Sequence, residues 1–259
     1  MGASFAAIVT AAGSSARMWQ REGVPVKKEY LPLGPGPAGG DPLTVLGAAV
    51  LAFARFDEIG VIVVTVPPDG EALARAALPA ELRERCDSSS RSGGASILFT
   101  GGGSTRRDSV YRALSLLGSR EWAPLWVLIH DGARPWVSAD LIRRVMDAVV
   151  RHGAVIPLVP LLETPKEIGE GGVVLKHLRR SALGLAQTPQ AFAFSRILQA
   201  HRAAHRAAHR AAHERAVHER AGGFEYTDDA EIWGEFCGPV ATVPGERGNR
   251  KITYMEDLA

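Results

Sequence analysis

Five short runs of apolar residues recur along this chain of 259 residues, and stretches with helical spacing of apolar residues lie between them. The runs are nearly continuous rather than alternating, which is typical of strands that helices cover on both faces. Strands that alternate with helices predict βαβ units and an α/β fold with a mostly parallel sheet. The predicted strands are 6–10, 60–66, 96–100, 126–130 and 154–159. The predicted helices are 44–54, 109–117 and 139–150.

The first predicted strand runs into a loop of residues with little side chain, 11–16, which Arg17 follows. Small residues let a ligand lie against the main chain, where successive N–H groups form a concavity that suits an anion. Lys27 and Lys28 come ten residues later and add positive charge. Neither GxxxxGK[ST] nor GxGxxG follows the strand. The pattern predicts a nucleotide-binding loop that differs from the two common phosphate fingerprints.

Charge and cysteine content exclude several classes of protein. The net charge is only +2, so no global basic field favours nucleic acid. Cys86 and Cys237 lie far apart without CxxC spacing, so we expect two free thiols rather than a disulfide or a zinc site. We find no signal-peptide pattern, and no apolar stretch approaches the roughly 18 residues of a membrane span. We therefore expect a cytoplasmic enzyme that binds neither nucleic acid nor membrane.

Three segments depart from the strand and helix pattern. Residues 34–42 and 88–94 are rich in Gly, Pro or Ser and predict surface loops. Residues 201–220 repeat HRAA three times, and Ala and Arg favour a helix. Histidines four residues apart can chelate a metal, but we interpret this repeat as a solvent-facing helical insertion. We therefore assign no role to its histidines at 201, 205, 209 and 213.

Six motifs follow one another over almost the whole chain. They are AAGSSARM with KKEYLPL at 11–33, GGSTRRDSV at 102–110, HDGARP at 130–135, QTPQ at 187–190, TDDA at 227–230 and GERGNRKIT at 245–253. In this order they resemble the motifs of the 2-C-methyl-D-erythritol 4-phosphate cytidylyltransferases, and six matches in order make chance agreement implausible. The resemblance implies a Rossmann-like sheet of the nucleotidyltransferase type in a single domain over residues 1–259.

The resemblance also implies a β-arm at about 158–186 that reaches into a partner subunit. Residues 169–172 (GEGG) independently read as the hairpin turn of such an arm. A homodimer whose active sites are shared through the arm would follow.

The chain departs from the family pattern at several positions. The departures are Ser15 for a glycine, Lys27 for a proline, Glu29 for a glutamine, Gly132 for an alanine and Glu163 for the aspartate before Thr164. Lys27 matters most, because two adjacent lysines compete for one role. The register with Tyr30 favours Lys28 as the catalytic lysine.

The family reaction transfers a cytidylyl group from CTP to a polyol phosphate and releases pyrophosphate. An acceptor oxygen attacks the α-phosphorus in line, so the protein contributes positioning and charge stabilisation. The resemblance implies that Arg17 and Lys28 stabilise the transition state, the alternatives being a solvated arginine and a surface lysine. It implies that Lys251 and Arg180, with Arg179 as a competitor, hold the acceptor phosphate. Thr164 and Thr227 would hydrogen-bond that phosphate.

By resemblance the cytosine lies against the main chain, where a close backbone can separate its amino group from the carbonyl of uracil. The implied nucleotide-binding residues are Ala11, Ala12, Gly13, Ser15, Gly102, Gly103, Ser109, Asp131, Gly132 and Arg134. Gly102 and Gly103 could equally form a simple turn, and Ser109 could be the N-cap of its helix. Asp131 is the expected ligand of Mg²⁺ or another divalent cation, the alternatives being a turn cap or a pair with Arg134. We interpret His130 as structural.

Two further functions remain open at this point. Cytidylyltransferases for other polyol phosphates, such as D-ribitol 5-phosphate, share much of the signature and differ chiefly around Thr164, Arg180 and Thr227. A nucleotide-binding protein that has lost the reaction would keep the fold. The presence of Arg17, Lys28, Asp131 and Lys251 argues against that last interpretation.

Overall fold

The structure is a computed structural model that describes residues 4–16, 18, 27–34, 42–86, 94–217 and 226–258, with the backbone alone for 209–217. Its strands are β1 (Phe5–Thr10), β2 (Pro32–Gly34), β3 (Leu43–Thr44), β4 (Ile59–Val66), β5 (Ser96–Gly101), β6 (Trp126–Asp131), β7 (Ala154–Pro160), β8 (Lys166–Ile168), β9 (Val174–His177), β10 (Gly184–Ala186), β11 (Gln190–Ala193) and β12 (Ala241–Pro244). Its α-helices are α2 (Val45–Ala54), α3 (Glu71–Ala76), α4 (Ala80–Arg83), α5 (Arg106–Gly118), α6 (Ala139–His152), α7 (Phe194–Val217) and α8 (Asp229–Phe236). Short 3₁₀ turns are η1 (Lys28–Tyr30), η3 (Glu170–Gly172), η4 (Arg180–Ala182) and η5 (Met255–Leu258).

The structure confirms the predicted elements. Each of the five predicted strands ends within one residue of an observed strand, and the three predicted helices are α2, α5 and α6. Helix α5 begins three residues earlier than predicted because the Thr105 hydroxyl caps it by accepting a hydrogen bond from the Asp108 N–H.

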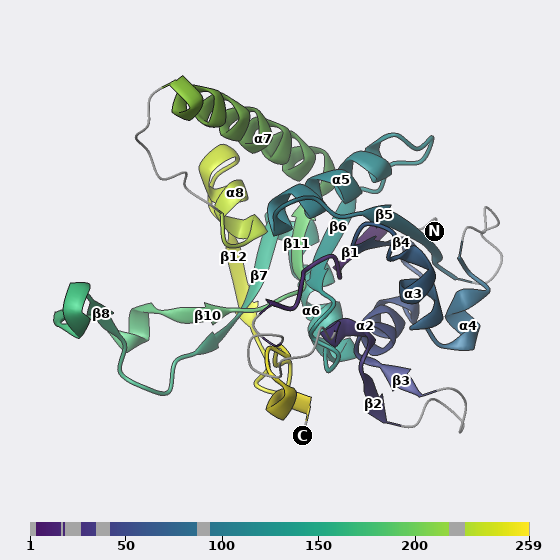
Figure 1. The fold of residues 1–259 in the computed structure, drawn as a ribbon, viewed down its shortest axis with the longest axis horizontal. Coiled ribbons are helices and arrows are strands. Elements are labelled where there is room, and N and C mark those ends of the chain that lie inside the picture. Colours follow the sequence, from purple (N-terminus) through teal and green to yellow (C-terminus); the bar gives the residue numbers. More distant parts are fainter. Residues whose placement is uncertain are drawn as a thin grey trace.

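The central sheet is mostly parallel and has β1 in its middle (Figure 1). Strands β4 and β5 lie on one side of β1 and β6 on the other, all parallel to it, and the order along the sheet is β10-β7-β11-β6-β1-β4-β5. Strand β11 is antiparallel between β6 and β7, and β12 pairs with β7 in parallel. The chain therefore changes direction across the sheet at β1, and ligands of open α/β sheets bind outside the strand ends at such a switch point.

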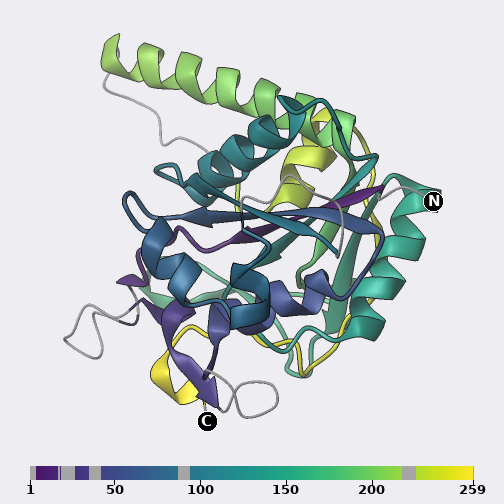
Figure 2. The same cartoon turned by 90° about the vertical axis from the view of Figure 1, so that its right-hand side faces the viewer.

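Helices cover both faces of the sheet, as the continuous apolar strands require. Ala7 and Val9 of β1 pack in one core with α2 and α6, whereas Ala6 and Ile8 pack in a second core with α5, α7 and α8. Figure 2 shows α5 and α7 above the sheet and the α2 to α4 region below it.

An arm extends from the far end of β7, away from the sheet (Figure 1). It contains the antiparallel pair β8–β9, and Gly171 and Gly172 in the turn have φ angles of 72° and 78°. The left-handed conformation at both positions confirms the hairpin turn expected at 169–172. The arm leaves large apolar side chains uncovered in this chain, among them Leu162, Ile168, Val173 and Leu175 at 60–65% exposure.

The histidine-rich repeat is not solvent-facing along its whole length, as we had interpreted it, because its first turn is buried. Helix α7 begins at Phe194, seven residues before the repeat, and the repeat's first turn is packed between α5 and α8. His201 is fully buried, and the ring of His205 stacks on Tyr111 with ring centroids 4.7 Å apart. The interpretation was wrong at this end because the repeat continues a helix whose inner face already belongs to the core. Residues 218–220 of the predicted insertion lie outside the described residues.

Most of the two predicted loops, residues 35–41 and 88–93, likewise fall outside the described part of the chain. Cys86 and Cys237 are both free thiols, as expected. Of the helices that the structure describes, none combines the length and the hydropathy needed to span a membrane.

Candidate active site

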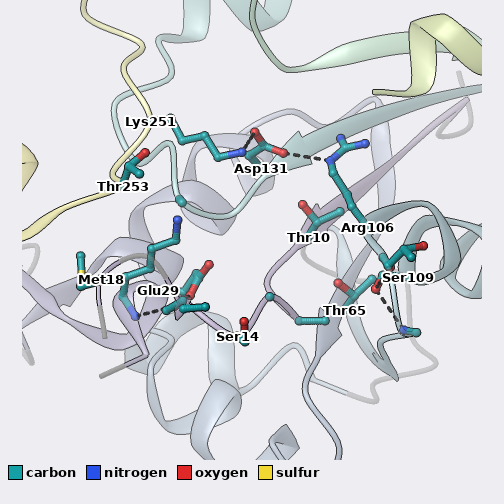
Figure 3. A pocket seen from close by; sticks show the side chains of 18 of the residues that line it. Thr10, Ser14, Met18, Glu29, Thr65, Arg106, Ser109, Asp131, Lys251 and Thr253 are labelled. Atoms are coloured by element: carbon teal, nitrogen blue, oxygen red, sulfur yellow. Dashed lines mark hydrogen bonds and ion pairs between the residues drawn. The ribbon is translucent and has the colours of Figure 1, made fainter. Parts of the chain in front are cut away.

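A cavity of about 670 Å³ opens at the carboxyl ends of the central strands (Figure 3). The register places Thr65 of β4, Thr10 of β1 and Asp131 of β6 in one row at its floor. The remaining lining comes from connecting loops, η1, the first turns of α5 and the C-terminal segment: Ala12, Gly13, Ser14, Ser15, Ala16, Met18, Lys28, Glu29, Gly103, Ser104, Thr105, Arg106, Ser109, Ala133, Lys251 and Thr253. Four of the six motifs found in the sequence thus line one cavity directly, and the other two contact its lining through Thr188, which bonds Asp131, and Asp229, which pairs with Arg106.

The loop after β1 turns sharply at Ser15. Its φ of 55° is left-handed, which explains why a glycine at this position is the expected family residue. The Ser15 hydroxyl accepts a hydrogen bond from the Lys28 N–H at 3.3 Å and donates one to Glu29 at 3.4 Å. A serine is tolerated here because its side chain joins the loop to η1.

Lys28 and Lys27 have different surroundings. Lys28 lines the cavity, is only 8% exposed, and its Nζ donates a hydrogen bond to the Ile252 carbonyl oxygen at 2.9 Å. Lys27 is not part of the lining; its Nζ contacts the Gly13 carbonyl oxygen and pairs with Glu29 at 2.9 Å. Lys28, the lysine that the register with Tyr30 favoured, is therefore the one of the two that lines the cavity.

Two glycines let the loop after β5 pack closely, Gly102 against the loop after β1 and Gly103 against the first turn of α5. A Cβ on Gly102 would stand 2.2 Å from the Ala12 Cβ, and one on Gly103 would stand 2.3 Å from the Asp108 Cβ. The Ser109 hydroxyl accepts a hydrogen bond from the Gly103 N–H at 3.0 Å and donates one to the Thr105 carbonyl oxygen at 2.9 Å. Ser109 therefore fixes the glycine loop from within the helix, and the alternative that it is the N-cap is wrong because Thr105 holds that position.

Asp131 at the end of β6 is surrounded by three cations. Lys251 Nζ lies 2.8 Å from Oδ2, Arg106 Nε lies 3.3 Å from Oδ1, and Arg134 Nε lies 3.6 Å from Oδ2. Figure 3 shows Lys251 and Arg106 pointing at the carboxylate from opposite sides. Burial raises the pKa of Asp131, but the charges of Lys251 and Arg106 outweigh it and hold the pKa well below its usual range. The alternative that Asp131 pairs with Arg134 is therefore also present, with the longest of the three distances.

Arg106 and Asp229 are site residues that sequence reasoning missed. Arg106, the first residue of α5, lines the cavity and bridges Asp131 to Asp229, which its Nη1 contacts at 2.8 Å. The signal was the arginine pair in GGSTRRDSV, in which the sequence does not distinguish Arg106 from Arg107. In the structure Arg107 pairs with its neighbour Asp108 instead.

Lys251 reaches the cavity on a loop that is fastened to the end of β6. Arg134 Nη1 donates to the Asn249 carbonyl oxygen at 2.7 Å, and Asn249 Nδ2 donates to the Thr188 carbonyl oxygen at 2.7 Å. Gln187 adds hydrogen bonds to the carbonyl oxygens of Glu246 and Asn249. The QTPQ and GERGNRKIT motifs are thus adjacent in space. Arg134 does not line the cavity but holds the loop that carries Lys251.

His130 is buried next to the site and has the surroundings of a structural residue. Its Nε2 donates to the Arg134 carbonyl oxygen at 3.0 Å, and its Nδ1 accepts from the Thr188 hydroxyl at 3.0 Å. Burial lowers the pKa of His130 to about 4, so the ring is neutral at pH 7 and supports this arrangement.

Several predicted residues do not line the cavity. Ala11, Gly102, Gly132 and Arg134 are chain neighbours or bonding partners of lining residues, whereas Thr164, Arg180 and Thr227 lie elsewhere. Arg17 is outside the described residues. Thr164 is exposed on the arm, and the Arg180 guanidinium there bonds the Leu162 carbonyl oxygen. Thr227 is exposed before α8, where its hydroxyl donates to Glu231 at 3.0 Å. Within one chain the arm residues and the cavity are therefore separate.

The cavity offers few protein oxygens to a divalent cation, so a bound substrate must supply the remaining ligands of the metal. Among the described residues no three His, Cys, Asp or Glu side chains cluster as a metal site would require. Asp131 is an ionised carboxylate in the cavity wall, and hard cations with few protein ligands usually share phosphate oxygens and waters. Asp131 therefore fits a cation that arrives with a polyphosphate.

Known proteins share this architecture. A sequence model of the family described as 2-C-methyl-D-erythritol 4-phosphate cytidylyltransferase (IspD) matches residues 5–259. A bifunctional enzyme IspD/IspF from Solidesulfovibrio magneticus is 40% identical over 254 residues, which are 97% of this chain and 55% of the relative. The chain spans about half the length of the curated relatives it matches.

Solved structures lead to the same family. A 4-diphosphocytidyl-2C-methyl-D-erythritol synthase from Anaerococcus prevotii is similar with a TM-score of 0.69 and 26% identity, over 98% of this chain and 92% of that one. A 2-C-methyl-D-erythritol 4-phosphate cytidylyltransferase from Thermus thermophilus has a TM-score of 0.65 and 28% identity, over 97% and 94% of the two chains. These similarities confirm the expected Rossmann-like, mostly parallel fold. The chain belongs to the 2-C-methyl-D-erythritol 4-phosphate cytidylyltransferase family.

Proposed function

We propose that this chain transfers a cytidylyl group from CTP to 2-C-methyl-D-erythritol 4-phosphate. The products are 4-diphosphocytidyl-2-C-methyl-D-erythritol and pyrophosphate, in the non-mevalonate route to isoprenoids, and the reaction belongs in the cytoplasm. One domain over residues 1–259 carries the activity. The observation that supports this most is the convergence of the β1 loop, the Gly103–Ser109 segment, Asp131 and Lys251 on one cavity at the topological switch point.

The cavity offers different chemistry to the two ends of CTP. The cytosine fits between the β1 loop and the Gly103 turn, where main-chain groups lie close and the side chains are small. The triphosphate extends toward Lys28, Arg106 and Lys251, the cations that line the described part of the cavity. Arg17 would add charge on the family pattern, and its neighbours Ala16 and Met18 line the cavity.

In the reaction an oxygen of the acceptor phosphate forms a bond to the α-phosphorus of CTP. The bond from that phosphorus to the bridging oxygen of the β-phosphate breaks, and pyrophosphate leaves with the electron pair. Charge grows on the α-phosphoryl oxygens and on the leaving group, so the fixed ammonium of Lys28 stabilises the transition state more than the ground state. Lys251 reorients from Asp131 toward a phosphate when the substrates bind, because its side chain is 35% exposed and able to move.

Asp131 would hold Mg²⁺ or a similar divalent cation, which would neutralise charge on the triphosphate when bound. Its depressed pKa keeps the carboxylate ionised throughout the neutral range.

We propose that Thr164 and Arg180 bind the acceptor phosphate in the cavity of a partner subunit, in a homodimer. The support is their separation from the cavity of their own chain and the uncovered apolar side chains of the arm. Mixing two inactive variants, Lys28→Met and Arg180→Ala, tests this directly. Sharing in trans predicts that mixed dimers regain activity at one of their two sites, whereas action within one chain predicts no recovery.

The proposed activity is tested by Mg²⁺-dependent pyrophosphate release from CTP with either acceptor. We expect turnover with 2-C-methyl-D-erythritol 4-phosphate and little with D-ribitol 5-phosphate. The reverse preference would assign the chain to another polyol phosphate. Binding of CTP without turnover on either acceptor would contradict catalysis and leave a nucleotide-binding role.

A further inference from the structure

A line of polar side chains runs from the interior of the protein to the candidate active site. His201 of α7 contacts Asp229 at the start of α8, Nε2 to Oδ1, at 3.1 Å. The other oxygen of Asp229 accepts a hydrogen bond from Arg106 at 2.8 Å, and Arg106 in turn contacts Asp131. Three helices and one strand, far apart in the sequence, thus meet through these four side chains.

The two inner members of this line are almost without solvent. His201 is 0% and Asp229 1% exposed, and both sit beside the core that α5, α7 and α8 form with the sheet. Burying polar groups costs free energy unless they are hydrogen-bonded. Among the described residues, Nδ1 of His201 has no hydrogen-bond partner, so the bond from Nε2 to Asp229 is the contact that offsets its burial. A leucine at this position would leave the buried Oδ1 of Asp229 without the hydrogen bond from His201.

Asp229 is held so that one oxygen faces Arg106. Burial raises the pKa of its carboxyl, but the charge of Arg106 and the hydrogen bond from His201 outweigh it, so the pKa is lowered and the group is ionised. An ionised carboxylate only accepts hydrogen bonds, which makes His201 Nε2 the donor. The backbone is fixed as well, because Gln190 bonds both Asp228, at 2.8 Å, and the Ala230 N–H, at 3.1 Å.

Arg106 depends on this support for its direction. Its side chain leaves the first turn of α5 and lies between two carboxylates, one in the cavity wall and one behind it. Without a fixed Asp229, the guanidinium would follow the Asp131 carboxylate or solvent, since about a quarter of its side chain is exposed. Two fixed acceptors define the plane of a guanidinium better than one.

We propose that His201 is a positioning residue for the nucleotide site: through Asp229 it orients Arg106 against Asp131. The expected effect on kcat/KM for CTP rests on the proposed cytidylyltransferase function. The expected effect on the orientation of Arg106 rests only on contacts within the protein. The proposal assigns a purpose to the first histidine of the repeat.

A double-mutant cycle tests the proposal. We expect His201→Leu to lower kcat/KM for CTP about tenfold, since displacing a positioned group by an ångström costs up to about 100-fold. His201→Gln, which keeps a donor at similar reach, restores most of the activity. Because His201 acts through Arg106, the pair His201→Leu and Arg106→Gln loses no more than Arg106→Gln alone. His205→Leu, the same change one repeat later, is the matched control and stays within about twofold of the parent chain, because His205 stacks on Tyr111 away from the cavity.

The proposal would be overturned if the fold-losses in kcat/KM of the two single variants multiplied in the double variant, or if His201→Gln failed to restore activity. Either result would mean that His201 serves only to fill the core. Should His201→Leu not fold, His201→Asn replaces it, because its shorter amide stays polar but does not reach Asp229.

A readout without substrates separates this inference from the proposed function. In ¹H–¹⁵N spectra, the Arg106 Nε–H signal, assigned by its loss in Arg106→Lys, is expected to be protected from exchange in the parent and in His201→Gln. It is expected to broaden in His201→Leu. A signal that stays protected in His201→Leu contradicts the inference whatever the activity of the chain. A parent without turnover would contradict only the proposed function.

Discussion

Gly102→Ala tests how closely the two nucleotide loops must approach. The added Cβ would stand 2.2 Å from the Cβ of Ala12, 3.0 Å from the Ser109 hydroxyl and 3.3 Å from the Val66 carbonyl oxygen. Ordinary carbon–carbon contact is about 3.5–4.0 Å, so the β1 loop must recede by roughly 1.3–1.8 Å. Because Ala12 lines the cavity, this displacement widens the cytosine site itself.

We expect Gly102→Ala to lower kcat/KM for CTP by about 100-fold, the loss typical of a displacement of about an ångström at a reacting site. Overpacking should also lower the free energy of unfolding by about 1–3 kcal/mol. Gly101→Ala is the matched control one residue earlier, because its Cβ would meet nothing nearer than Arg112 Nη1, at 4.0 Å. Steady-state kinetics and urea unfolding of both variants measure the two effects. If Gly102→Ala kept the activity of Gly101→Ala, close approach of these loops would not define the site.

Two other predictions concern residues beside the cavity. Lys28→Met should lower kcat about 10²–10³-fold, as loss of a charge-stabilising donor does, whereas Lys27→Met should cost less than tenfold; larger loss at Lys27 would reverse the assignment. Burial lowers the pKa of His130 to about 4, so the folded state binds fewer protons than the unfolded state, whose histidine has a pKa of about 6.5. Stability from this group is complete above pH ~6.5 and falls by about 3 kcal/mol as the pH drops toward 4. Urea unfolding of the parent and His130→Gln at pH 7 and pH 4.5 checks this, and equal losses in both proteins would contradict it.

The fold was predictable because its strands are apolar on both faces. The runs that became β1 and β4 contain no charged side chain, and the structure buries both as interior strands of the sheet. The antiparallel β11 was not predicted, because QAFA is too short to display a period. The start of α7 was missed for a different reason: the low-complexity repeat obscured a helix that begins in ordinary core sequence at Phe194.

The site was predictable where a motif consists of small residues or isolated charges. Lys28, Asp131 and Lys251 converge as the motif order implied. The role of Arg106 was not predictable, because either arginine of the pair satisfies the motif and only the direction of the first helical turn decides. The burial of His201 was not predictable either. In the sequence the histidines of the repeat look equivalent, but the first one lies where α7 packs in the core.

The central claim is that CTP occupies the cavity at the switch point of the sheet. A crystal structure of the protein with CTP and Mg²⁺ tests it most directly. The account predicts the cytosine between Ala12 and Gly103, with the triphosphate reaching Lys28, the cation on Asp131 and Lys251 released from that carboxylate. A nucleotide bound elsewhere, or bound here with Lys251 still paired to Asp131 and the triphosphate turned to solvent, would contradict it.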